Sequence, residues 1–164
     1  MHVRGIVFGS IIAIAAGAAW SHGGGQEKKA AAKPAEVSTE EHAFGRAGDP
    51  KKANRTVQVG MDDTMHFTPG DLVLKKGETV KFLVRNNGKI MHEMVIGTLK
   101  ELKEHAELMR KLPGMEHDEP YMAHVEPNKQ GELVWQFTRA GEFFYACLIP
   151  GHLEAGMIAK ITVK

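Results

Sequence analysis

Apolar and polar residues alternate along most of the chain after position 55, a pattern typical of short, half-buried β-strands. The segments that show the pattern or an apolar stretch of strand length lie at residues 56–59, 71–74, 79–85, 92–96, 132–137, 143–147 and 157–163. Turn residues separate these segments, most clearly Asn86-Asn-Gly88. The pattern therefore predicts an all-β fold, a Greek-key sandwich with a single core.

One segment has the period of a helix instead. Its apolar residues are Leu99, Leu102, Ala106, Met109 and Leu112. Thr98 and Glu101 have the spacing of an N-terminal capping box, and Pro113-Gly114 would end the helix. We expect one helix and a following loop, together roughly residues 98–124, inserted between the strands at 92–96 and 132–137.

The first 19 residues have the pattern of a secretory signal peptide. Arg4 precedes a short apolar run, and small residues at 17–19 offer a cleavage site. The run is too short for a comfortable membrane span, so we expect export to the periplasm without stable membrane insertion. An uncleaved anchor is the alternative.

Residues 20–53 are predicted to be a disordered, flexible linker, because Gly, Lys, Ala and Pro residues dominate them. From residue 23 onward, Val37 and Phe44 are the only sizeable apolar residues of this segment, and the stretch from Phe44 to Asp49 is a candidate for packing against the domain. The folded domain is assigned to residues 54–164.

Charge excludes one class of partner. The formal net charge is +1, and loss of Arg4 with the leader leaves 20 basic and 20 acidic side chains. Such a balance gives no indication of nucleic-acid binding. The chain has a single cysteine, which excludes an internal disulfide and calls for another explanation in an exported protein.

That cysteine begins the segment with the clearest chemistry. Cys147, His152 and Met157 follow one another with four residues between each pair. Thiolate, imidazole and thioether, joined by a second imidazole, make up the ligand set of an electron-transfer copper site. Zinc also accepts cysteine and histidine, but its usual ligands include no thioether. The methionine therefore favours copper.

This loop, following an aromatic strand, resembles that of the type 1 copper proteins, the cupredoxins, with a spacing closer to azurin and rusticyanin than to plastocyanin. The resemblance covers about residues 54–164. It implies that His92 is the second imidazole ligand and Met157 the weak axial ligand, beside Cys147 and His152. Many cupredoxins follow the first histidine with an asparagine that braces the cysteine loop, whereas this chain has Glu93. The reduction potential and the colour of other cupredoxins therefore cannot be assigned to this chain.

Further histidines and methionines suggest auxiliary copper sites. Met115, His117, Met122 and His124 lie close together in a segment expected to be a polar loop, where thioethers suit Cu(I) and imidazoles suit either oxidation state. Packing methionines and ordinary loop histidines are the alternative. This clustering is similar to that of the periplasmic copper-tolerance cupredoxins of the CopI type, a resemblance that implies protection against excess copper.

His22 offers a separate copper ligand. Cleavage after Ala19 would place it third in the mature chain, where an amine, two amides and an imidazole form a square-planar Cu(II) site. Cleavage after Ala18 would remove this motif. Copper(II) titration of the mature chain against its His22→Ala variant tests it.

Two functions remain open at this stage. The first is a copper-tolerance protein that binds copper, cycles between Cu(II) and Cu(I), and could oxidise Cu(I), which would make it enzyme-like. The second is a soluble electron carrier between periplasmic redox partners, docking near His152. Pure storage is disfavoured because the loop resembles that of an electron-transfer site.

Overall fold

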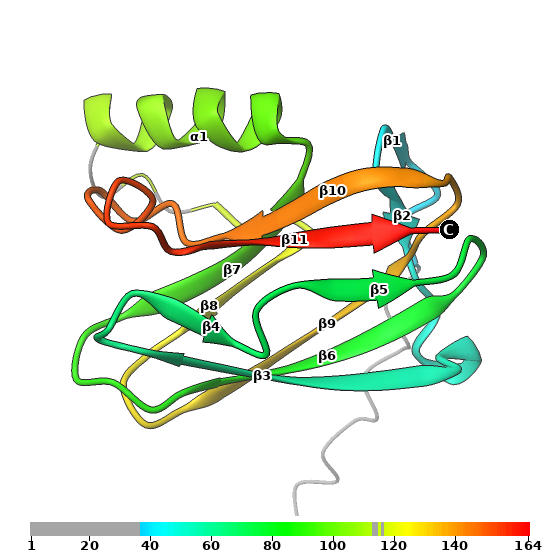
Figure 1. The fold of residues 1–164 in the computed structure, drawn as a ribbon, viewed down its shortest axis with the longest axis horizontal. Helices are drawn as coiled ribbons and strands as arrows, with labels where there is room; N and C mark the ends of the chain where they lie inside the picture. Colours follow the sequence, from blue (N-terminus) through cyan, green and yellow to red (C-terminus); the bar gives the residue numbers. More distant parts are fainter. Residues whose placement is uncertain (1–36, 113–114, 116) are drawn as a thin grey trace, which may run out of the picture. The chain divides into compact units, whose positions relative to one another are not determined.

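Two β-sheets lie face to face in the described part of the chain (Figure 1). The computed structural model describes residues 37–112, 115 and 117–164. The expected signal peptide at 1–19, His22 and the expected linker up to residue 36 lie outside these residues. Within the described residues, no helix has the length and apolar character needed to span a membrane.

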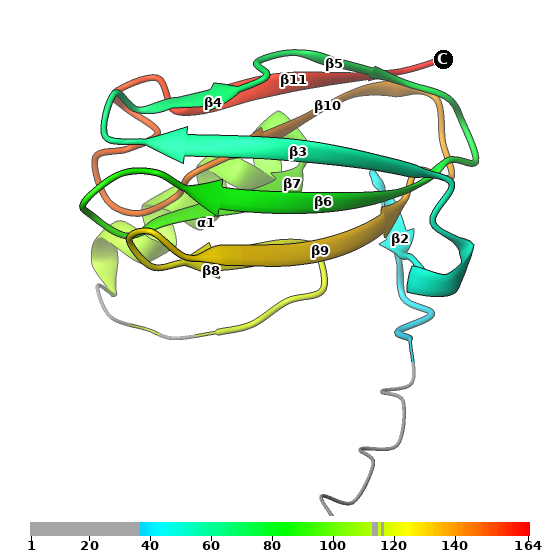
Figure 2. The same ribbon diagram turned by 90° about the horizontal axis from the view of Figure 1, so that it is seen from below.

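The first sheet has six strands, in the spatial order β1 (Glu41–His42), β2 (Gly45–Ala47), β9 (Gln130–Gln136), β6 (Thr79–Asn86), β3 (Arg55–Asp62) and β4 (His66–Thr68). The second sheet has five, in the order β5 (Leu72–Leu74), β11 (Ile158–Val163), β10 (Gly141–Ala146), β7 (His92–Gly97) and β8 (Met122–Val125). The pairs β3–β6 and β5–β11 are parallel, and the other pairs are antiparallel. Figure 2 shows β3, β6 and β9 side by side in the first sheet.

The core lies between the sheets, where the alternating apolar residues meet. On β6, Val80, Phe82 and Val84 are completely buried. Register places Val80 opposite Trp135 and Phe82 opposite Leu133 on β9. Burying each large apolar side chain contributes about 1.5–3 kcal/mol, so the alternation that predicts the strands also stabilises the sandwich.

All seven strand segments expected from the pattern are confirmed, and the structure adds β1, β2, β4 and β8. Each added strand has only two to four residues, too few to show a periodic pattern. The expectation of a polar loop at Met122 and His124 is wrong, because both lie on β8, which pairs with β7. Tertiary pairing, rather than local sequence, makes this segment a strand.

The predicted helix is confirmed as α1 (Leu99–Lys111). Thr98 accepts a hydrogen bond from the Glu101 N–H, and the Glu101 side chain accepts from the Thr98 N–H, which is the expected capping box. The helix lies on the outer face of the second sheet, against β7 and β10, and Leu102 is its buried residue (Figure 1). Strand β7 is therefore covered on both faces and is buried along its whole length.

The ordered part of the chain begins earlier than residue 54. Strands β1 and β2 and a 3-10 turn, η1 (Pro50–Lys52), lie within the segment expected to be linker. Phe44 is only 2% exposed and stacks on Trp135 with ring centroids 5.1 Å apart. The Trp135 indole N–H donates to the Phe44 carbonyl at 2.9 Å. The expected linker therefore does not extend to residue 53, and one buried aromatic side chain is the physical reason.

Replacing Phe44 tests whether this segment is part of the domain. Because its ring fills a space beside Trp135, Phe44→Ala should lower the free energy of unfolding by about 3–5 kcal/mol in a denaturant titration. Val37, in the same segment, is 36% exposed, and Val37→Ala should change the value by less than about 0.5 kcal/mol. Equal stabilities of the two variants would contradict the packing described here.

Candidate metal centre

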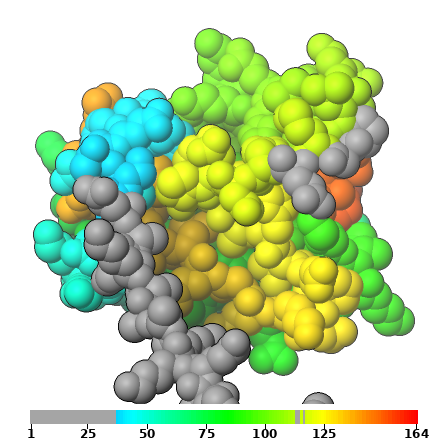
Figure 3. All heavy atoms as spheres, turned by 180° about the vertical axis from the view of Figure 1, so that it is seen from behind, coloured from blue at the N-terminus to red at the C-terminus, as the bar shows by residue number. Residues whose placement is uncertain are grey.

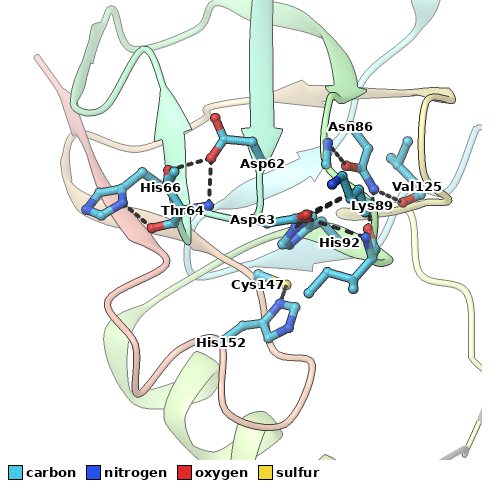
Figure 4. Close-up of polar contacts among 12 residues, drawn as sticks. Asp62, Asp63, Thr64, His66, Asn86, Lys89, His92, Val125, Cys147 and His152 are labelled. Carbon is cyan, nitrogen blue, oxygen red and sulfur yellow. Dashed lines mark hydrogen bonds and ion pairs between the residues drawn. The ribbon is translucent and has the colours of Figure 1, made fainter.

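Three side chains converge at one end of the sandwich. His92 begins β7, Cys147 follows β10, and His152 lies in the loop between β10 and β11. One ligand atom from each lies within 4.8 Å of the other two. The Cys147 Sγ is 3.2 Å from the His152 Nδ1, and the two imidazole centroids are 4.9 Å apart (Figure 4).

The loop from Cys147 to Met157 is closed by its own backbone. The Cys147 N–H donates to the Met157 carbonyl, and the Met157 N–H donates to the His152 carbonyl, each at 3.0 Å. Gly151 and Gly156 have φ angles of +93° and +97°, which favour glycine because a Cβ is strained there. Pro150 and Gly151 lie in a turn, which returns His152 to the sulfur.

The protonation states fit a bound cation. Burial raises the pKa of the Cys147 thiol to about 12, although the N–H groups of Glu93 and Ile149 favour the thiolate. A thiolate at neutral pH thus needs positive charge beside it, which a metal ion supplies. Burial, and then the neighbouring His92, lower the pKa of His152, so its imidazole is neutral and free to coordinate.

One orphaned atom points to the same conclusion. The His92 side chain is fully buried, and its Nδ1 is the buried side-chain polar atom without a hydrogen-bond partner in the described part of the chain. Leaving such an atom unpaired costs about 1–3 kcal/mol. A metal ion between His92, Cys147 and His152 would satisfy it, so the residues present fit a copper ion.

Met157 is also completely buried and belongs to the same apolar cluster as Cys147. The backbone hydrogen bond between the two residues places Met157 next to the cysteine at the start of the last strand. This position agrees with the expected axial role, which stays a prediction.

Asp63, in the turn between β3 and β4, supports His92. Its carboxylate lies 3.3 Å from the His92 Nε2 and accepts the N–H of Lys89 at 2.9 Å (Figure 4). The Lys89 N–H, and then His92 itself, lower the pKa of Asp63, so the carboxylate is ionised. Gly88 is required beside it, because a Cβ there would lie 2.0 Å from the Asp63 Oδ1. No sequence pattern distinguishes Asp63 from the acidic residues around it.

Glu93 braces the cysteine loop in place of the asparagine found in many cupredoxins. It is 3% exposed, and its backbone N–H donates to the Cys147 Sγ at 3.4 Å. One carboxylate oxygen accepts the Leu148 N–H at 2.8 Å, and the other lies 2.8 Å from the His124 Nε2. Hydrogen bonding to this carboxylate raises the pKa of His124. Glu93 thus connects the thiolate loop to β8.

The structure separates the expected auxiliary ligands. His117 and His124 approach each other, with ring centroids 6.2 Å apart. Met122 is buried in the small apolar cluster beneath α1, whereas Met115 is 38% exposed. His105, which the sequence pattern did not single out, lies against His117. In the sequence, the only indication of a role for His105 is its helical spacing, which places it beside the apolar face of α1.

Comparison with known proteins also indicates copper binding. Residues 53–164 match the family described as copper binding proteins, plastocyanin/azurin family. The chain is 52% identical over 121 residues to the copper-resistant cuproprotein CopI of Rubrivivax gelatinosus, covering 74% of this chain and 73% of that protein. It is 41% identical over 113 residues to CopI of Vibrio cholerae, covering 68% and 67%.

Solved structures share the fold. Auracyanin B superposes with a TM-score of 0.61 at 20% identity, over 73% of this chain and 96% of auracyanin B. An azurin from Methylomonas superposes with a TM-score of 0.54 at 14% identity, over 68% and 99%. At these identities the likeness concerns the sandwich alone, and it confirms the expected fold class.

The contact between Asp63 and His92 should matter for metal affinity. Asp63→Ala frees the ring of His92, and loss of such a support typically costs 10–100-fold in metal affinity. Competition with a copper chelator would measure the change. Asp62→Ala is the matched control, because the adjacent Asp62 bonds to Thr64 and not to His92. Unchanged affinity in Asp63→Ala would contradict the supporting role.

Proposed function

Because this chain belongs to the plastocyanin/azurin family of copper-binding proteins, we propose that it is a copper-tolerance protein with a type 1 centre. The observation that carries the proposal is its 52% identity to a copper-resistant cuproprotein, CopI, along a domain that contains the buried group of His92, Cys147 and His152. Copper is the cofactor, and Met157 is the proposed fourth ligand.

Copper held in such a site exchanges one electron between Cu(II) and Cu(I). The chain contributes a fixed set of ligands. Backbone hydrogen bonds close the loop around His152, Asp63 orients His92, and Glu93 orients the sulfur. All four proposed ligands are buried, which excludes water from the sulfur and limits rearrangement between oxidation states.

His152 is the proposed point of electron exchange. It is the most exposed of the four proposed ligands, at 8%. Exposed Pro150 and partly buried Ile149 and Leu153 surround it in the sequence and offer an apolar rim for a redox partner. The periplasm is the proposed location, on the basis of the signal-peptide pattern at 1–19.

A soluble electron carrier remains the second candidate function. Its support is the same site and the apolar rim beside His152. A carrier needs one copper ion per chain, whereas a tolerance protein gains from further sites, and Met115, His117, Met122, His124 and His22 stay the predicted auxiliary ligands. Oxidation of Cu(I) as a substrate is a further hypothesis within the first function, testable by copper-dependent loss of added Cu(I) in air.

The Cys147→Ser variant tests the centre and the function together. Without the thiolate, the copper-loaded protein should lose its sulfur-to-copper charge-transfer colour in the visible spectrum. A deletion strain should grow poorly on high copper, and the wild-type gene, but not the Cys147→Ser gene, should restore growth. Normal growth of the deletion strain on high copper would favour the electron carrier instead.

The axial role of Met157 has a separate test. Leucine matches the volume of methionine but has no sulfur lone pair to donate to the metal. Met157→Leu should therefore retain copper and raise the reduction potential by on the order of 60 mV. Such a shift corresponds to a tenfold change in the relative stability of the two oxidation states. Protein-film voltammetry measures this. Met61→Leu, in the core on β3, is the control and should leave the potential unchanged. Equal potentials in the two variants would exclude Met157 as a ligand.

A further inference from the structure

A second group of imidazoles lies outside the buried centre. His105 comes from α1, His117 from the segment that follows it, and His124 from β8. On the face shown in Figure 3, the segment after the helix, in yellow, lies beside the helix, in light green. All three side chains are partly buried, which leaves them accessible to a small ion and shields them from bulk water.

The His105–His117 contact is that of two rings sharing one proton. Their Nε2 atoms are 2.7 Å apart, and the ring centroids 4.7 Å. The His117 Nδ1 lies 3.3 Å from the Met115 carbonyl oxygen, to which it donates, so the His117 Nε2 is left with its lone pair. Burial, and then the neighbouring His117, lower the pKa of His105, which favours its neutral form.

His124 is oriented in the way that metal-binding histidines usually are. Its Nε2 donates to the Glu93 carboxylate at 2.8 Å, which leaves Nδ1 as the coordinating atom. The exposed carboxylate of Asp118 lies 3.6 Å from that Nδ1. One ring nitrogen of each histidine is therefore hydrogen-bonded to an oxygen. That of His117 bonds to a backbone carbonyl, and that of His124 bonds to a carboxylate.

We propose that His105, His117 and His124 form a second metal site that takes a divalent cation of borderline softness, Cu(II) in preference to Zn(II), with Asp118 or water completing the coordination. Neighbouring imidazole nitrogens on a tetragonal Cu(II) ion lie about 2.8 Å apart, given bonds of about 2.0 Å. The nitrogens of His105 and His117 thus need only small adjustments. His124, whose ring centroid is 6.2 Å from that of His117, has to move toward the pair, since the three rings do not present nitrogens that all lie within 4.8 Å of one another. Among divalent first-row ions, Cu(II) binds such nitrogen sites most tightly.

This site shares no ligand with the type 1 centre, although Glu93 contacts both the cysteine loop and His124. It also differs from the auxiliary set expected from the sequence. It includes His105 and leaves out Met122, whose side chain packs in the apolar cluster beneath the helix. All three proposed ligands lie at or after residue 105, and only the orientation of His124 depends on an earlier residue, Glu93.

Copper titration of the full mature chain tests the proposal. The chain carries His22→Ala, which removes the predicted Cu(II) ligand of the tail. After one equivalent has filled the type 1 centre, a second Cu(II) should bind with the electron paramagnetic resonance spectrum of a nitrogen-coordinated site and without new charge-transfer colour. His105→Gln and His117→Gln, made separately, should each weaken this second ion at least tenfold.

His66→Gln is the matched control. The His66 Nδ1 also bonds to a backbone carbonyl two residues earlier, that of Thr64, but His66 is exposed and lies on β4. It should bind the second ion as the parent does. If both cluster variants retain the affinity of this control, the proposal is overturned. A copper anomalous-scattering peak between the three rings would support it, and a peak elsewhere would overturn it.

The second site and the proposed function can fail separately. Cys147→Ser removes the type 1 colour and should leave the second ion in place. Loss of both signals in Cys147→Ser would show that the second ion needs the thiolate, which would overturn an independent site. Loss of the second ion in the histidine variants with the colour intact would support it.

Discussion

The anchoring of the cysteine loop to strand β7 is the interaction on which the centre depends. Two hydrogen bonds that involve Glu93 form this anchor. The Glu93 N–H donates to the Cys147 sulfur, and the Glu93 carboxylate accepts the Leu148 N–H. A carboxylate that is 3% exposed is costly to bury unless it is fully paired. Here it is paired with a backbone N–H and with His124, so the charge stabilises the junction between strand and loop.

This junction also explains why β7 is covered on both sides. One face of the strand contributes Met94 and Ile96 to the core between the sheets. The other face lies under α1 and the loop, where Val95 packs with Leu102 and Leu148. Water is thereby kept from the backbone around His92. The inserted helix is thus part of the shell that protects the centre.

The sequence predicts the sandwich and the local half of the site well, because both depend on short-range patterns. Cys147, His152 and Met157 lie on one loop, and their spacing alone indicates copper. His92 needed a family resemblance, since only the fold brings it to the sulfur. Asp63 could not be predicted, because it acts through a partner from another part of the fold, and the same holds for the proposed role of His105. Phe44 could be singled out as a candidate for packing against the domain but not assigned to its core, because a single aromatic residue in a polar segment leaves no periodicity.

The self-closed loop has a kinetic consequence. Its backbone hydrogen bonds join Cys147, His152 and Met157 through main-chain atoms alone. The loop is therefore held in shape independently of its ligand side chains, and less conformational entropy remains to be lost on metal capture. Arrival of an ion therefore requires only small side-chain adjustments. Uptake by such a preorganised site is governed by encounter and ligand exchange, which suits the proposed role in copper tolerance.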